Sequence, residues 1–105
     1  MMIYTIHAPE ANKLSAVKTE MQRLGAPIIR VVNCGDYYMA LEGSHRIAAA
    51  HDLGIEPELV VYDQDDSLEI SSFDWYDSAN WAETVCPAGE VAGELYSVQA
   101  CTYSF

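Results

Sequence analysis

The feature that most constrains the fold of this chain is a pair of apolar runs joined by a short turn and followed at once by a helix signal. Residues 28–32 and 37–41 are rich in β-branched and aromatic side chains, and the Asn-Cys-Gly-Asp sequence at 33–36 is typical of a turn. We therefore predict a β-hairpin. Gly43 then breaks the second strand and Ser44 can begin a helix. Strands and helices in such close succession predict an α+β domain.

The same patterns extend to both sides of this unit. Apolar residues at helical spacing predict one helix that follows Ala8-Pro9 and ends at Gly25, and a second that begins at Ser44 and ends at Gly54. Strands are predicted at residues 3–7 and 58–62, and a final strand at residues 95–103. No repeat or linker divides the chain, so we expect residues 1–105 to form one domain.

The charge of the chain limits its partners. It carries 16 acidic and 5 basic residues, a formal net charge of -11, which repels the phosphates of duplex DNA. The same charge suits a surface that docks a basic protein partner. No signal peptide or membrane-spanning run is present, so we expect a cytoplasmic protein with no membrane partner. The three cysteines lack metal-ligand spacing, and we expect reduced, structural thiols.

The residues at the start of the second helix carry the clearest chemical signal. A helix N-terminus exposes backbone N–H groups and positive potential, so cationic side chains are unfavourable there unless an anion is bound. This chain nevertheless places His45 and Arg46, one of its five basic residues, in that first turn. Gly43 permits close approach, Ser44 offers a hydroxyl, and Arg46 offers a bidentate fork. We therefore predict a phosphate site formed by Gly43, Ser44, His45 and Arg46.

A structural interpretation of these residues also stands. In this interpretation Gly43 is simply a turn residue, Ser44 is a helix cap, and Arg46 pairs with Glu42 or Asp52. The tryptophans, Trp75 and Trp81, could stack a base, but we expect them to pack in the core, because a domain of this size needs large apolar anchors.

The segment from Tyr37 to Ala50, with Leu53-Gly54 and the strand at 59–62, resembles the core of the ParB/sulfiredoxin superfamily, over about residues 28–62. In that superfamily a Gly-x-His-Arg or Gly-Glu-Arg-Arg loop after a strand opens a helix and holds nucleotide phosphates. The resemblance implies a small mixed sheet with packed helices, and it implies that Gly43, Ser44, His45 and Arg46 bind a nucleotide such as ATP, ADP or CTP.

Activities differ within the superfamily, so the resemblance leaves the reaction open. Sulfiredoxins reduce cysteine sulfinic acid with ATP and carry a reactive Cys directly before the His-Arg pair, where this chain has Ser44. ParB proteins hydrolyse CTP and continue into a helix-turn-helix, for which the residues after Tyr62 leave little room. Other relatives are free-serine kinases. A nuclease ranks last, because neither a metal-carboxylate cluster nor a basic groove is evident.

Phosphoryl transfer or nucleotide hydrolysis would need Mg²⁺ and a base. The candidate catalytic residues are Glu42, Ser44 and His45. The candidate metal ligands are Asp63, Asp65 and Asp66, in an acidic run that we expect to be a solvated loop and that lacks the spacing of a calcium loop. The alternative function is a non-catalytic acidic interaction or inhibitor protein, from a phage or mobile element, that binds a basic partner.

Overall fold

A computed structural model describes residues 1–105 and confirms an α+β architecture built on a mixed sheet. The main sheet has five strands in the order β4-β2-β3-β1-β7. β2 and β3 form the predicted antiparallel hairpin, while β1 runs parallel to β3 and β4 runs parallel to β2. These strands are β1 (Met2–Thr5), β2 (Ile28–Asn33), β3 (Tyr38–Ala40), β4 (Glu58–Tyr62) and β7 (Cys101–Ser104).

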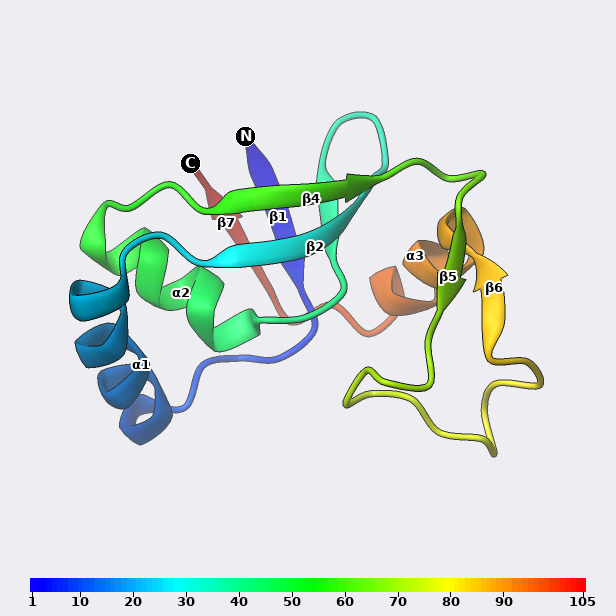
Figure 1. Ribbon diagram of the computed structural model, residues 1–105, viewed down its shortest axis with the longest axis horizontal. Helices are drawn as coiled ribbons and strands as arrows, with labels where there is room; N and C mark the ends of the chain where they lie inside the picture. The colour runs from blue at the N-terminus through cyan, green and yellow to red at the C-terminus, as the bar shows by residue number, and fades with distance from the viewer.

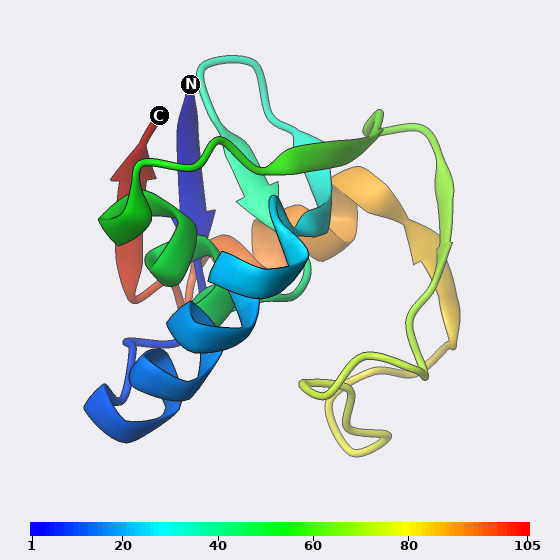
Figure 2. The ribbon, with the colours of Figure 1, turned by 60° about the vertical axis from the view of Figure 1, so that its left-hand side comes forward.

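Alternation of side chains along the strands builds a separate core on each face of the sheet. Val31 and Ala40 belong to one buried cluster, whereas their neighbours Val32 and Met39 belong to another. Successive residues of a strand point to opposite faces, so both faces need a cover. Two helices supply one cover, and a helix with a small second sheet supplies the other (Figures 1 and 2).

The first cover consists of α1 (Ala11–Leu24) and α2 (Ser44–Leu53), which pack against each other. Met21 of α1 is buried with Ala49 and Ala50 of α2, because the small alanine side chains let the two helices approach closely. Both helices therefore agree with the sequence patterns. None of the helices combines the length with the apolar composition that a membrane span requires.

The second cover comes from the last third of the chain, where sequence patterns were weakest. β5 (Ser67–Glu69) and β6 (Val85–Pro87) form a two-stranded sheet that extends to one side of the molecule (Figure 1), and α3 (Ala88–Tyr96) packs against the core beside it. The predicted strand at 95–103 is wrong in its first half. Leu95 is buried on α3 instead, and only Cys101–Ser104 pair with β1.

Candidate functional site

The junction between β3 and α2 depends on a glycine. Gly43 precedes the first residue of α2 with φ 74° and ψ 32°, a left-handed conformation that L side chains rarely adopt. A Cβ atom at this position would lie 2.6 Å from Cδ1 of Ile29 and 3.1 Å from Nη2 of Arg46. The turn therefore needs glycine both for its backbone angles and for its space.

The first turn of α2 leaves its backbone donors free. The N–H groups of Ser44, His45 and Arg46 have no hydrogen-bond acceptor within the chain, and the helix has no side-chain cap. The start of α3 is different, because the N–H groups of Ala88 and Gly89 donate to carbonyl oxygens of the turn after β4, at 2.7 Å and 2.9 Å. The start of α2 thus retains the donors that an anion requires.

Two side chains of this turn fix the segment that follows β1. Ser44, which is 7 % exposed, accepts a hydrogen bond at Oγ from the N–H of His7 at 3.3 Å. His45 accepts one at Nε2 from the N–H of Glu10 at 3.0 Å. Ser44 is therefore not the cap of α2, and its hydroxyl proton remains available to a ligand. In His45, Nε2 therefore takes part in a hydrogen bond, whereas Nδ1 does not.

Arg46 is the one Lys or Arg side chain without a carboxylate partner. The other four basic residues form ion pairs, namely Lys13–Glu10, Lys18–Asp52, Arg23–Glu20 and Arg30–Glu42. Arg46 instead donates from Nη1 to the carbonyl oxygen of Ile28 at 3.2 Å. The pairing of Arg46 with Glu42 or Asp52 that the structural interpretation offered is wrong, because Arg30 and Lys18 hold those two carboxylates.

The pair formed by Arg30 and Glu42 is bidentate. Nε and Nη2 of Arg30 donate to the two carboxylate oxygens of Glu42 at 2.8 Å and 2.7 Å, and the guanidinium carbon lies 4.4 Å from the centroid of the Phe73 ring. Hydrogen bonds from Arg30 hold the pKa of Glu42 below its ordinary value, and the positive charge of Arg46 lowers it further. Because both carboxylate oxygens are occupied, Glu42 is poorly placed to act as a base or a metal ligand.

A cavity of about 380 Å³ opens at this helix start. It is lined by all four residues of the predicted phosphate site together with Glu42. The sequence patterns missed the other polar residues of the lining, His7, Ser72 and Asp74, and the apolar Ile6 and Phe73 complete it. No local signal identifies them, because Ser72 and Asp74 reach the cavity only through the long connection between β5 and β6.

The three candidate metal ligands in the acidic run lie elsewhere, in the exposed turn between β4 and β5. Asp66 accepts a hydrogen bond at Oδ2 from the N–H of Asp63 at 2.8 Å, so this carboxylate closes a turn. These three aspartates are not grouped to hold a metal ion, and neither is any other set of three His, Cys, Asp or Glu residues. A metal ion at the α2 cavity would have to take ligands from its own lining, where Asp74 forms no ion pair.

The tryptophans pack as expected. Trp75 and Trp81 are half-buried against the larger core cluster, and Nε1 of Trp75 donates to the carbonyl oxygen of Leu41 at 2.7 Å. This bond anchors the connection between β5 and β6 to the end of β3, next to the candidate site. Cys34, Cys86 and Cys101 are free thiols, which agrees with the sequence-based expectation.

Comparisons of this chain with protein-family models, curated proteins and solved structures gave no match.

Substitution of Gly43 tests the geometry of the junction. Gly43→Ala forces a side chain into the left-handed region and against Ile29, so we expect the free energy of unfolding to fall by about 2 kcal/mol. The matched control is Gly93→Ala, at a site on α3 with nothing within 4 Å, which we expect to be neutral or slightly stabilising. Urea unfolding measures both changes. Equal stability of the two variants would contradict this account of the turn.

Substitution of Glu42 tests the ion pair through its pH dependence. A depressed pKa in the folded state means that Glu42 contributes stability above its ordinary pKa of 4.5 and loses it as the pH falls through the lower folded value. At pH 7 we expect the free energy of unfolding of Glu42→Gln, measured with urea, to be roughly 0.5–1 kcal/mol below that of the wild type. This difference in stability should close as the pH falls below that ordinary pKa. A gap that stays constant down to pH 3 would exclude this role for the ionised carboxylate.

Proposed function

We propose that the start of α2 binds the phosphate groups of a nucleotide. The observation that carries this proposal is that Arg46, the one Lys or Arg without a carboxylate partner, lies beside three backbone N–H groups that also lack partners. In a chain with 16 acidic residues, an arginine left unpaired beside the positive end of a helix is costly unless it meets an anion.

The proposed contacts follow from the donors in the cavity. The N–H groups of Ser44, His45 and Arg46 surround one phosphate, and the Ser44 hydroxyl donates to it. The Arg46 guanidinium exchanges its bond to the carbonyl of Ile28 for a charge-assisted fork to phosphate oxygens. The resemblance to the Gly-x-His-Arg loops of ParB/sulfiredoxin proteins supports a nucleotide, with ATP, ADP and CTP as the first candidates.

We propose that Mg²⁺ binds in this cavity together with the nucleotide. Mg²⁺ usually takes one or two protein carboxylates and completes its shell with phosphate oxygens and water. Asp74 is the cavity carboxylate without an ion pair, so it is the residue that we propose for such a contact. Glu42 is less suited to that role, because its bidentate bonds to Arg30 occupy a lone pair on each carboxylate oxygen. For any phosphoryl transfer or hydrolysis, Ser44 and His45 are the candidate catalytic residues in the cavity lining.

Nucleotide titrations test the proposal. Calorimetry with ATP, ADP, CTP and GTP, each with and without Mg²⁺, should give saturable binding for at least one of them. Arg46→Gln should raise the Kd by about tenfold or more, because it removes the charged fork. The matched control is Arg23→Gln, which removes the same charge from an exposed pair on α1 and should leave the Kd within about twofold.

Two results would overturn this function. Equal weakening by Arg46→Gln and Arg23→Gln would mean that binding depends only on net charge. The absence of saturable binding for all four nucleotides would mean that the free donors of α2 serve no nucleotide.

A further inference from the structure

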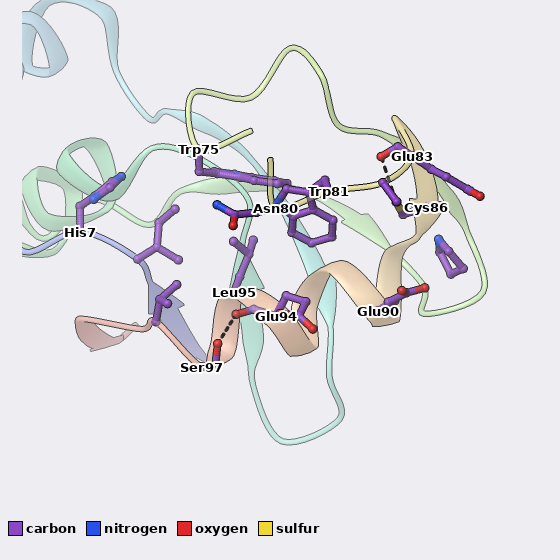
Figure 3. A pocket seen from close by; sticks show the side chains of 14 residues that line it. His7, Trp75, Asn80, Trp81, Glu83, Cys86, Glu90, Glu94, Leu95 and Ser97 are labelled. Carbon is purple, nitrogen blue, oxygen red and sulfur yellow. Dashed lines mark hydrogen bonds between the residues drawn. The ribbon is translucent and has the colours of Figure 1, made fainter. Parts of the chain in front are cut away.

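A second and larger cavity, of about 860 Å³, is lined by Trp75, the residue that follows Phe73 and Asp74 of the α2 cavity. One wall is the connection between β5 and β6, which carries Trp75 and Trp81, and the opposite wall is α3 (Figure 3). Its volume falls in the range of small-molecule sites. It shares Ile6 and His7 with the α2 cavity, but none of the residues proposed to bind phosphate.

The aromatic wall of this cavity is formed by two packed indole rings. The Trp75 ring stacks on Phe73 at a centroid distance of 5.2 Å and an interplanar angle of 9°, and its N–H is bonded to Leu41. The Trp81 ring is tilted by 49° against Trp75 at a centroid distance of 5.5 Å, and its own N–H has no acceptor in the chain. Two inclined indole rings present π faces that attract a cation.

Three glutamates give this cavity a strongly negative lining. Glu83, Glu90 and Glu94 line it, and none of them forms an ion pair. No lysine or arginine lines the cavity, and the cation behind its aromatic wall, Arg30, is paired with Glu42. Burial raises the pKa of the adjacent Cys86 thiol, and the negative charges of Glu90 and Glu83 raise it further. An anionic ligand would be repelled here.

The arrangement of the carboxylates selects the kind of cation. They are not grouped to hold a metal ion, so a compact ion such as Mg²⁺ would not meet several ligands at once. A flexible chain with several separated positive charges can meet several separated carboxylates, and its methylene groups can pack on indole rings. We propose that this cavity binds a linear aliphatic polyamine, with its ammonium groups on Glu83, Glu90 and Glu94 and its chain against Trp75 and Trp81.

Calorimetry with spermidine tests this proposal on the intact chain. We expect saturable binding at 150 mM NaCl that weakens at higher salt, as a charge-dependent site should. Glu90→Gln/Glu94→Gln should raise the Kd by about tenfold or more, because it removes two carboxylates from one wall. The matched control, Glu56→Gln/Glu58→Gln, removes the same charge from exposed positions outside the cavity and should change the Kd by less than about twofold.

Substitution of Trp81 separates the aromatic contribution from the charge. Trp81→Leu keeps an apolar side chain but removes the π face, and it should weaken spermidine binding several-fold while nucleotide binding stays unchanged. Thermal unfolding of each variant shows that the fold is retained. If Trp81→Leu fails to fold, Trp81→Phe provides the same comparison with a weaker π face.

Three outcomes would overturn the polyamine site. The first is equal weakening by the cavity and control double variants. The second is competition by Mg²⁺ at the concentration at which spermidine binds, which would indicate a diffuse charge effect. The third is binding of an arginine-rich peptide at these residues with no saturable spermidine binding, which would indicate a basic protein partner instead.

Discussion

The bidentate pair between Arg30 and Glu42 is the interaction on which both cavities depend. The pair joins Arg30, in the middle of β2, to Glu42, the residue before Gly43. It therefore fixes where α2 begins relative to the sheet. The outer side of the same guanidinium supports the Phe73 ring, on which Trp75 stacks. With side-chain exposures of 38 % and 24 %, the pair contributes modestly to stability. Its larger effect is to position the helix start and the aromatic wall.

Charge is unevenly distributed in this molecule. All five lysines and arginines lie within the first 46 residues, whereas residues 47–105 carry most of the acidic side chains. The fold brings the last of these cations, Arg46, to the start of α2, and gathers Glu83, Glu90 and Glu94 around the neighbouring cavity. The two adjacent cavities therefore differ in charge: Arg46 lies with Glu42 and Asp74 in the lining of the α2 cavity, whereas three glutamates line the other.

The sequence patterns predicted the elements whose formation depends on residues close together in the chain. The hairpin, the Gly43 junction and α2 depend on turn residues and on helical spacing, and the sequence patterns placed them well. The pairing of Arg30 with Glu42 escaped prediction because it crosses the hairpin. α3 escaped it because Gly89 and Gly93 weaken the helix signal, while the β4–β5 turn satisfies its first N–H groups. Ser72 and Asp74 reach the α2 cavity through tertiary contacts alone.

If the free N–H groups of α2 hold phosphate, a ¹⁵N NMR titration with ATP detects the contact at those groups directly. We predict that the largest chemical-shift changes occur at the backbone amides of Ser44, His45 and Arg46. The first turn of α1, residues 11–13, provides an internal comparison because it is also a helix start but lies exposed outside the cavity. Changes of equal size there, or changes spread along the chain without a maximum at α2, would contradict the account.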